Sequence, residues 1–452
     1  MIVCKFGGTS VADAAAIRRT AEIVRGRVAQ QPVIVVSALA GTTNALLAVA
    51  EQAASGHLVA AIATVEALRE KHMAVVAELL GDDDTAREIA ADESVLFDVL
   101  AHLAEALSVL GHVTERSLDA ISSIGEQLSA PIITAAFIRA GVDAVLVDSR
   151  QVMITDASFG RAEPLPDSIA AACRDHLAPL VRAGKVPVLG GYLGATIEGV
   201  TTTLGRGGSD YSASLLGAAL EADAIEIWTD VDGMLTADPR VVDDARLIEH
   251  IRFDEAAELA SFGAKVLHPN TIAPAVRRGI PVFVFNSLKP AGKGTRITFD
   301  APRLPVRAIA GKANVVIVKV RSARMLATPG ALRAIFEVFE RNRTSVDVVA
   351  TSEVSVSLTV DDDQHLDAVV GQLREFGDVS VERGRAIVAV VGAGLGESSP
   401  AMARALTAIG DVRLHMVSLS ATGINLTLIV DGDELKPVIR RLHAAFFPAA
   451  AP

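Results

Sequence analysis

Several short segments of the chain combine charged or hydroxyl side chains with consecutive glycines. The first, residues 5–10, reads Lys-Phe-Gly-Gly-Thr-Ser and follows an apolar run. Adjacent glycines let backbone N–H groups approach an anion closely. Lys5 supplies a positive charge, and Thr9 or Ser10 can cap a following helix whose N-terminus attracts phosphate. The segment lacks the Walker A pattern. It indicates a phosphate-binding turn, with a Gly-Gly turn beside a surface lysine as the alternative.

A second glycine-rich segment, residues 201–210, reads Thr-Thr-Thr-Leu-Gly-Arg-Gly-Gly-Ser-Asp and opens a predicted helix. Its three glycines permit unusual backbone angles and close approach of a ligand. Arg206 offers a bidentate fork for a carboxylate or phosphate, and Asp210 could hold a cation or orient a lysine. The pattern favours an anion site over a capped turn with a surface Arg–Asp pair.

Two later segments carry groups suited to a nucleotide. Residues 228–233, Trp-Thr-Asp-Val-Asp-Gly, end a predicted strand, where open α/β sheets bind ligands. Carboxylates at that point suit Mg²⁺–nucleotide, although an Asp-Gly turn is common. Residues 262–269, Phe-Gly-Ala-Lys-Val-Leu-His-Pro, contain Lys265, which could meet the phosphates or lie solvated on the surface.

Two further positions could recognise a small polar substrate. Residues 37–44, Ser-Ala-Leu-Ala-Gly-Thr-Thr-Asn, form a small polar turn after the second predicted strand, suited to a hydroxyl or backbone contact. Glu126 could pair with a substrate ammonium, and a helix-surface glutamate is the alternative.

The elements that must position these residues alternate between short β-branched runs and longer Ala/Leu-rich ones over the first 300 residues. This alternation predicts a parallel-sheet α/β domain. The predicted strands are residues 2–6, 33–37, 144–148, 186–190, 224–229 and 282–285. The predicted helices are residues 12–27, much of 45–110, 124–140, 166–183, 209–220, 253–262 and 271–278, of which 50–110 is expected to form a helical lid or subdomain.

Beyond a proline-containing seam at residues 298–312 the chain contains an internal repeat. Residues 354–361 match residues 424–431, and Thr328-Pro329 corresponds to Ser399-Pro400. Each copy reads strand, helix, strand, strand, helix. Two such units can pair their sheets and leave effector clefts at helix N-termini and strand ends.

Length and composition restrict the class of protein. The 452 residues predict about two to four domains. A net charge of −12 without a basic block disfavours nucleic acid as the main partner. Two cysteines exclude a disulfide scaffold and a thiolate zinc cluster. The N-terminus has no signal-peptide pattern and no long uncharged apolar stretch appears, so a cytoplasmic protein without a membrane partner is expected.

Taken in order, the motifs at residues 5–10, 201–210 and 262–269 resemble those of aspartate kinase in the amino acid kinase family. The resemblance runs from Lys5 to about Phe447, and the tail, with segments 345–347 and 351–353, is similar to the paired ACT domains of monofunctional, lysine-sensitive members. It implies a three-layer α/β/α catalytic domain over 1–300. Two ferredoxin-like ACT domains would follow, an effector-binding one at 312–384 and a regulatory, dimerising one at 385–452.

By that resemblance the reaction is ATP-dependent phosphorylation of L-aspartate to 4-phospho-L-aspartate, the first step toward lysine (the diaminopimelate pathway), threonine and methionine, with Mg²⁺ accompanying ATP. The acceptor carboxylate, whose ordinary pKa is about 3.9, is already ionised and needs no base. Catalysis then rests on positioning and positive charge. No metal site built from protein side chains is expected. A homodimer or larger oligomer is implied.

The resemblance assigns roles by position. The catalytic group would comprise Lys5, Asp210 and Lys265. The aspartate site would comprise Ser37, Thr43, Glu126 and Arg206. The ATP site would comprise Lys5, Gly7, Gly8, Ser209, Thr229, Asp230, Leu235, Arg240, Lys265 and Val266. Leu235 stands where family members often carry an aromatic residue, so it would offer adenine only apolar contact.

The repeat also bears on the effector. Asp347 and Glu353 of the first copy correspond to Val417 and Gly423 of the second, so only the first copy has carboxylates for a diamino ligand. This favours lysine in the first copy. By resemblance its pocket would comprise Met325, Thr328, Gly330, Ala331, Leu332, Ser345, Val346, Asp347, Ser352 and Glu353. Ala331 stands where relatives often have a bulky aromatic residue.

Two alternatives remain at this level. One is another amino acid kinase, acting on glutamate, N-acetylglutamate or a nucleotide. The other is a catalytically silent amino acid sensor, which would be expected to have lost Lys5 and Lys265.

Overall fold

The computed structural model describes residues 1–263, 269–322, 329–361 and 364–448. The chain divides into two compact units, Met1–Met234 with Val266–Phe299, and Leu235–Lys265 with Asp300–Pro452. Residues 235–263 thus pack with the C-terminal unit, although the resemblance implies a first domain that ends at residue 300. The domain boundaries inferred from the resemblance stay a prediction.

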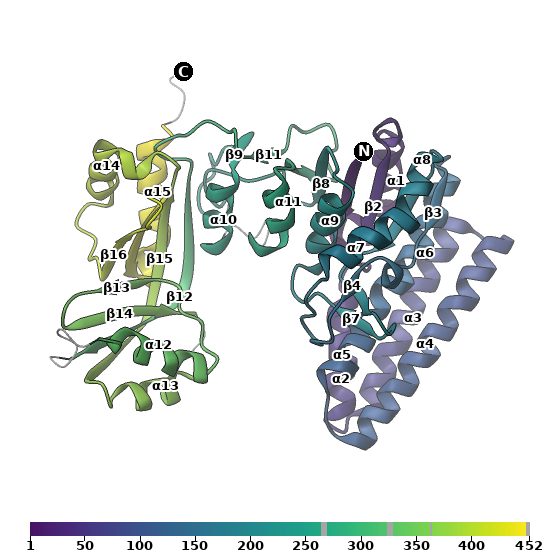
Figure 1. Ribbon diagram of the computed structural model, residues 1–452, viewed down its shortest axis with the longest axis horizontal. Coiled ribbons are helices and arrows are strands. Elements are labelled where there is room, and N and C mark those ends of the chain that lie inside the picture. The colour runs from purple at the N-terminus through teal and green to yellow at the C-terminus, as the bar shows by residue number, and fades with distance from the viewer. Residues whose placement is uncertain (264–268, 323–328, 362–363, 449–452) are drawn as a thin grey trace. The chain divides into compact units, whose positions relative to one another are not determined.

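A mostly parallel sheet forms the centre of the first unit (Figure 1). Within this unit its strands follow the order β3-β5-β2-β1-β8-β10-β11; β3, β5, β2, β1, β8 and β10 pair parallel, and β11 pairs antiparallel with β10. All six predicted strands are confirmed. The strands are β1 (Ile2–Phe6), β2 (Pro32–Val36), β3 (Ala144–Leu146), β5 (Val186–Gly190), β8 (Ala224–Thr229), β10 (Val282–Asn286) and β11 (Thr295–Thr298).

Helices cover both faces of this sheet, as continuous Val/Ile strands require. Cys4 and Phe6 pack in the cluster that includes α1 and α6, whereas Val3 on the opposite face approaches Gly217 of α9. The three-layer α/β/α arrangement is confirmed. The helices of the unit are α1 (Ala14–Arg25), α2 (Thr42–Ala54), α3 (Leu58–Leu80), α4 (Asp84–Leu110), α5 (Glu115–Ser122), α6 (Ile124–Arg139), α7 (Pro166–Ala172), α8 (Ala178–Arg182), α9 (Gly208–Ala219) and α11 (Ala273–Arg278).

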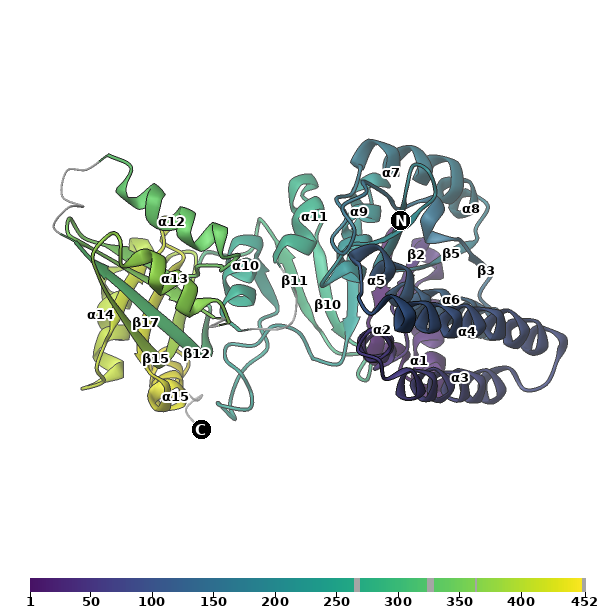
Figure 2. The ribbon, with the colours of Figure 1, turned by 90° about the horizontal axis from the view of Figure 1, so that it is seen from below.

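The predicted helical subdomain consists of α2, α3 and α4. The two long helices α3 and α4 run side by side (Figures 1 and 2) and enclose an apolar cluster with α2. His72 of α3 and Glu93 of α4 are also buried there, at 0% and 1% exposed. The continuous helical run Glu115–Arg139 is long and apolar enough to cross a membrane by length and composition alone, but 83% of its most apolar stretch is buried inside the protein, as in a soluble core helix.

A small second sheet, which the sequence reasoning did not predict, lies in the same unit. It comprises β4 (Ile154–Thr155), β6 (Leu193–Thr196) and β7 (Thr201–Thr203) in the order β4-β6-β7. It carries the chain into the glycine-rich segment that starts α9.

The second unit contains β9 (His250–Arg252), α10 (Phe253–Ser261) and the repeat. The predicted order strand, helix, strand, strand, helix is confirmed in both copies, and helices α12 and α13 pack at one end of the shared sheet and α14 and α15 at the other (Figure 1). The first copy comprises β12 (Ala308–Arg321), α12 (Ala331–Arg341), β13 (Val349–Thr351), β14 (Ser355–Val360) and α13 (Leu366–Leu373). The second comprises β15 (Asp378–Val391), α14 (Ser399–Ile409), β16 (Met416–Leu419), β17 (Asn425–Asp431) and α15 (Leu435–Phe446).

The sheet of the repeat has the order β13-β14-β12-β15-β17-β16. Strand β12 pairs β15 along almost its whole length, from Ala308 opposite Val391 to Arg321 opposite Asp378. The later half of β12 pairs β14, and the later half of β15 pairs β17. Each copy therefore completes its sheet with a strand segment of the other.

Candidate active site

The predicted site residues of the first unit gather at one edge of its central sheet. Strand register places Phe6 opposite Val36 and Trp228, and Val36 opposite Gly190. The carboxyl ends of β5, β2, β1 and β8 therefore meet at the same edge, where open α/β sheets bind ligands.

Lys5 and Asp210, distant in sequence, form an ion pair at this edge. The Lys5 ammonium Nζ lies 2.7 Å from Asp210 Oδ1, and the two side chains are only 11% and 15% exposed. Asp210 thus holds the lysine, one of the two roles predicted for it, and does not form the surface pair with Arg206 that was the alternative. A lysine fixed in this way presents a preorganised positive charge.

The turn after Lys5 has the predicted close approach, but not the predicted cap. A Cβ at Gly7 would lie 3.4 Å from Lys5 Nζ, and one at Gly8 3.2 Å from the Ala38 carbonyl oxygen. The prediction that Thr9 or Ser10 caps the next helix is wrong. Residues 8–11 form a 3-10 turn, α1 starts at Ala14, and its cap is Asp13, which accepts from the Ala16 N–H.

Ser10 serves a different purpose from the predicted cap. Its Oγ lies within hydrogen-bond distance of two acceptors, the Trp228 carbonyl oxygen at 3.2 Å and Ser287 Oγ at 2.8 Å, and the Gly7 N–H donates to the same carbonyl at 3.1 Å. These hydrogen bonds to β8 and to the residue after β10 hold the turn against the sheet edge, which explains why Ser10 is not available as a helix cap.

Glu126, at the start of α6, is a buried carboxyl with one unused oxygen. It is 3% exposed, and Oε1 accepts from the Ala38 N–H at 3.2 Å. Within the part of the chain that the structure describes, Oε2 has no hydrogen-bond partner. Burial raises the pKa of Glu126 to about 8, while the Ala38 N–H and the charge of Lys5 act to lower it. A ligand ammonium would satisfy the unused oxygen and favour the ionised form.

Hydroxyl groups from two segments meet beside this carboxyl. Ser37, just after β2, donates its Oγ–H to Ser209 Oγ at 3.1 Å. Gly190 and Gly191 leave room for this arrangement, because Cβ atoms there would lie 2.9 Å from Glu126 Cβ and 2.7 Å from Ser209 Cβ. The sequence reasoning did not assign these two glycines to the site, although a Gly-Gly pair ending a predicted strand was a visible signal.

Thr43 lies in the first turn of α2, next to the helix that carries Glu126. A Cβ at Gly125 would lie 3.5 Å from Thr42 Cγ2, so α2 and α6 approach closely there. The neighbouring Thr42 Oγ1 is buried, and among the described residues it has no hydrogen-bond partner. The predicted threonine and glutamate thus stand on adjoining helix starts.

Arg206 projects from the turn that starts α9. The flanking Gly205 and Gly207 have φ of +72° and +75°, the left-handed region that favours glycine. Arg206 is exposed, and its guanidinium forms no ion pair with any residue that the structure describes. It is a free bidentate donor at the rim of the same sheet edge.

The predicted nucleotide residues divide into three groups. Thr229 and Asp230 end β8, where Thr229 Oγ1 donates to Asp230 Oδ1 at 3.2 Å and Ser287 Oγ donates to the Thr229 carbonyl at 3.0 Å. Leu235 and Arg240 belong to the second unit, where Arg240 ion-pairs with Asp238 at 2.7 Å. Lys265 and Val266 lie outside the described residues, so the predicted meeting of Lys5 with Lys265 stays a prediction.

The predicted effector residues lie in the first copy of the repeat. Gly330, with φ of +86°, precedes α12, which starts with Ala331 and Leu332, while Met325 and Thr328 lie outside the described residues. Asp347, 24% exposed at its side chain, lies 3.2 Å from Lys312 Nζ. Ser345, Val346 and Asp347 precede β13, and Ser352 and Glu353 lie in the exposed turn between β13 and β14, where Ser352 Oγ contacts Ser355 Oγ at 2.7 Å.

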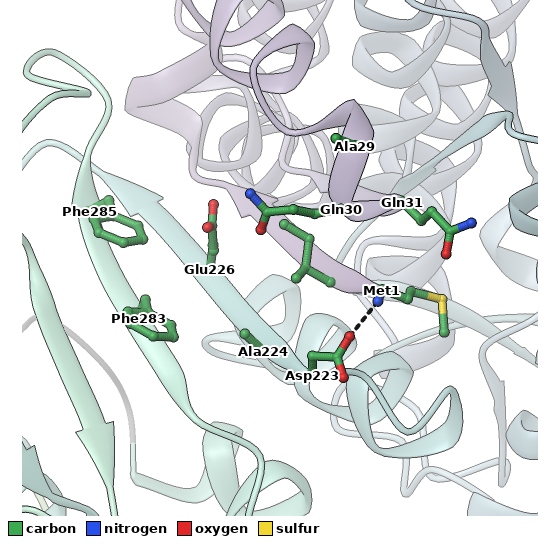
Figure 3. Close-up of a pocket in the computed structure, with 10 residues that line it drawn as sticks. Met1, Ala29, Gln30, Gln31, Asp223, Ala224, Glu226, Phe283 and Phe285 are labelled. Atoms are coloured by element: carbon green, nitrogen blue, oxygen red, sulfur yellow. Dashed lines mark hydrogen bonds and ion pairs between the residues drawn. The ribbon is translucent and has the colours of Figure 1, made fainter.

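A separate cavity of about 460 Å³ opens at the other edge of the central sheet (Figure 3). Met1, Ile2 and Ala224 line it at the amino ends of β1 and β8, together with Phe283 and Phe285 of β10. It is therefore distinct from the edge that carries Lys5 and Glu126.

Comparison with known proteins identifies the family of the chain. Residues 1–286 match the amino acid kinase family. The chain is 38% identical over 457 residues to lysine-sensitive aspartokinase 3 of Escherichia coli, covering 99% of both chains. It is 36% identical to the chloroplastic aspartokinase 3 of Arabidopsis thaliana, covering 98% of this chain and 81% of that one. The chain therefore belongs to the amino acid kinase family, and within it to the aspartokinases.

Solved structures give the same assignment for the fold. The structure of E. coli aspartokinase III in complex with aspartate and ADP superposes with a TM-score of 0.86 at 37% identity, covering 99% of this chain and 100% of that one. The structure of the same enzyme in complex with lysine and aspartate gives a TM-score of 0.83 at 36% identity, covering 99% of each chain. The paired ACT arrangement expected for the tail is confirmed with the rest of the fold.

Proposed function

We propose that this protein is an aspartate kinase that transfers the γ-phosphoryl group of ATP to the side-chain carboxylate of L-aspartate. A carboxylate oxygen forms the new P–O bond, the bond to the β,γ-bridging oxygen breaks, and ADP leaves. The products are 4-phospho-L-aspartate and ADP. The observation that carries this proposal is the convergence of the Lys5–Asp210 ion pair with the half-satisfied carboxyl of Glu126 at one sheet edge.

Each residue then has a role that follows from its chemistry. Glu126 Oε2 would accept from the substrate ammonium, and the Arg206 fork would hold the carboxylate that does not react. Thr43 and Ser37 would supply hydroxyl contacts to the substrate. The acceptor carboxylate is ionised at neutral pH, so positioning and charge neutralisation supply the catalysis, with no general base.

The phosphate end of ATP would meet the Lys5 ammonium and the backbone N–H groups of Gly7 and Gly8, with Ser209 nearby. Thr229, Asp230, Leu235, Arg240, Lys265 and Val266 complete the proposed nucleotide site. Mg²⁺ would bind together with ATP, next to its β- and γ-phosphates, and would neutralise part of their charge. Asp230, an exposed carboxylate at the carboxyl end of β8, is an oxygen donor that fits such an ion.

We further propose that lysine inhibits the enzyme by binding the first copy of the repeat. The exposed start of α12 at Gly330, Ala331 and Leu332 and the carboxylates of Asp347 and Glu353 offer partners for both ends of an amino acid with two ammonium groups. The E. coli relative named above is called lysine-sensitive. Inhibition requires that lysine bind a less active state more tightly than the active one. A cytoplasmic homodimer formed through the C-terminal unit is part of this proposal.

The activity is tested by following ADP release with L-aspartate, L-glutamate and N-acetyl-L-glutamate as acceptors. We expect L-aspartate to give a kcat/KM at least tenfold above the others. A preference for glutamate or its N-acetyl derivative would reassign the substrate, and no turnover with any of the three would favour the silent amino acid sensor.

Substitution of Lys5 tests the phosphate role. We expect Lys5→Ala to lower kcat by roughly 10²–10³-fold, the cost of removing one preorganised transition-state donor, with little change in the KM for aspartate. Lys185→Ala, at the amino end of β5, is the matched control and should leave both constants unchanged. Equal and small changes in kcat and KM for Lys5→Ala would contradict the role.

A further inference from the structure

A second buried carboxylate, Asp119, lies on α5, the helix that leads into Glu126. It is 1% exposed, and it accepts three hydrogen bonds. Oδ2 accepts from the backbone N–H groups of Gly160 at 3.0 Å and Thr203 at 3.1 Å, and Oδ1 accepts from the Thr203 hydroxyl at 2.6 Å. Among the described residues no lysine or arginine ion-pairs with it, so its polar partners are these neutral donors.

The donors belong to the turn at Gly160 and to the end of β7, which leads into Arg206. Thr203 is the last residue of β7, and its carbonyl accepts from the Ala162 N–H at 2.9 Å, so Asp119 and the 156–163 loop both fix this strand end. Gly205 follows in the left-handed conformation, and a Cβ on it would lie 3.2 Å from the Gly160 carbonyl oxygen. The path from the carboxylate to Arg206 is therefore short and tightly packed.

The arrangement explains why a carboxylate is useful at this position. An exposed arginine side chain has many rotamers, so the precision of its fork depends on how well its backbone is held. Three donors that converge on one buried, charged acceptor are held more firmly than three donors to water, since charge-assisted hydrogen bonds are shorter and stronger.

We propose that Asp119 is a positioning residue for substrate recognition: it fixes the end of β7 and the Gly160 turn, and thereby sets the place of the Arg206 guanidinium that holds the non-reacting carboxylate of the substrate. The inference rests on the role proposed for Arg206. Asp119 itself does not touch substrate.

Thr203 gives the sharpest test, because its neighbour on the same strand is a matched control. Thr203→Val removes the hydroxyl that donates to Asp119, and we expect the KM for aspartate to rise about tenfold, with kcat and the KM for ATP within twofold of the wild type. Thr203→Ser restores the hydroxyl and should restore the KM. Thr202→Val removes a buried hydroxyl that contacts Thr155 Oγ1 at 2.7 Å, and it should leave the KM unchanged.

Asp119 is tested through two variants and their coupling to Arg206. Asp119→Ala should raise the KM for aspartate by 10- to 100-fold. Asp119→Asn should raise it only a few-fold, because the amide oxygen can accept from both N–H groups while its NH₂ donates to the Thr203 hydroxyl. In an Arg206→Ala background, Asp119→Ala and Thr203→Val should add little further change, the mark of residues that act through one group.

The outcomes separate this inference from the proposed function. If Arg206→Ala leaves the KM for aspartate unchanged, the substrate role of Arg206 fails. If Arg206→Ala raises that KM but the Asp119 and Thr203 effects are fully additive with it, or change kcat and both KM values alike, the positioning role is overturned. Should Asp119→Ala not fold, the Thr203→Val and Thr203→Ser pair decides the question alone.

Discussion

Glu126 shows how a single side chain can report on substrate binding. Its carboxyl is buried beside Lys5, one oxygen is unused among the described residues, and its pKa is raised to about 8. In the free enzyme the group is therefore largely protonated below that pH. An ammonium group binds favourably only to the ionised form. The free energy of aspartate binding should therefore include the cost of ionising the Glu126 carboxyl, and this cost is largest at low pH.

This gives a pH prediction at the residue scale. We expect kcat/KM for aspartate to increase as pH rises from 6.5 toward 8 and then to level off, while Glu126→Gln shows no such rise. The substitution should also lower kcat/KM by roughly 10- to 100-fold near pH 8, in line with about 1.5–3 kcal/mol for a hydrogen bond to a charged group. Steady-state kinetics across the pH range measure this, and a variant that kept the rise would exclude Glu126 as its source.

Candidate site residues could be proposed from the sequence where a short local motif contains them. The glycine turns identified Lys5, Arg206 and Asp210 because each motif places a charge next to glycines. The cap at Thr9 or Ser10 was mispredicted, since Asp13 is the better-placed acceptor and Ser10 finds partners on β8 and after β10. Asp119 gave no local signal, because its three donors come from distant parts of the chain.

At the scale of elements, the α3–α4 pair buries two groups that titrate. Burial raises the pKa of Glu93 to about 8 and lowers that of His72 to about 4. Both Glu93 oxygens lack a hydrogen-bond partner among the described residues. The pKa of Glu93 is higher in the folded protein than its ordinary value of 4.5, so the folded state binds the proton more tightly than the unfolded state. Its contribution to the free energy of unfolding is therefore complete below pH 4.5 and is lost as pH rises through 8. The lowered pKa of His72 has the opposite effect: its contribution to the free energy of unfolding is complete above pH 6.5 and is lost as pH falls through 4.

We therefore expect Glu93→Gln to raise the melting temperature, and the gain to grow from pH 5 to pH 8. Each unit of pKa shift corresponds to about 1.4 kcal/mol, so a gain of several degrees at pH 8 is the expected size. Differential scanning calorimetry of the full chain measures it. Glu88→Gln, an exposed site on the same helix, is the control, and a gain that does not depend on pH would argue against this account.

The elements themselves were predictable where burial imposes a strong pattern. The apolar runs of β2 and β5, and that of β1 up to Lys5, are recognisable because both faces of the sheet are covered. Strands β4, β6 and β7 were not predicted because they are short, and their pairing partners rather than their composition define them.

At the scale of the whole molecule, the proposed lysine pocket belongs to the second unit, whereas Lys5, Glu126 and Asp210 belong to the first. Burial and the neighbouring Asp361 raise the pKa of Asp347 to about 6, although Lys312 acts to lower it. A protonated carboxyl is a poor partner for an effector ammonium. The proposed inhibition by lysine should therefore weaken when Asp347 becomes protonated.

We expect the lysine concentration for half-inhibition to fall as pH rises from 5.5 to 7.5. Asp347→Asn should raise that concentration at least tenfold and remove the pH trend, without changing kcat in the absence of lysine. Isothermal titration with lysine gives the direct check. Asp433→Asn, an exposed site in the second copy, should behave as the wild type, and undiminished lysine binding in Asp347→Asn would contradict the proposed pocket.

The two long strands β12 and β15 have a mechanical consequence. Residues 308–312 and 385–391 pair beside β17, while residues 315–321 and 378–382 pair beside β14, so neither copy of the repeat owns a whole sheet. A truncation that deleted one copy would remove the β12–β15 hydrogen bonds of the remaining copy and leave an unpaired strand edge, which favours aggregation. The two copies should therefore unfold together, as one cooperative unit.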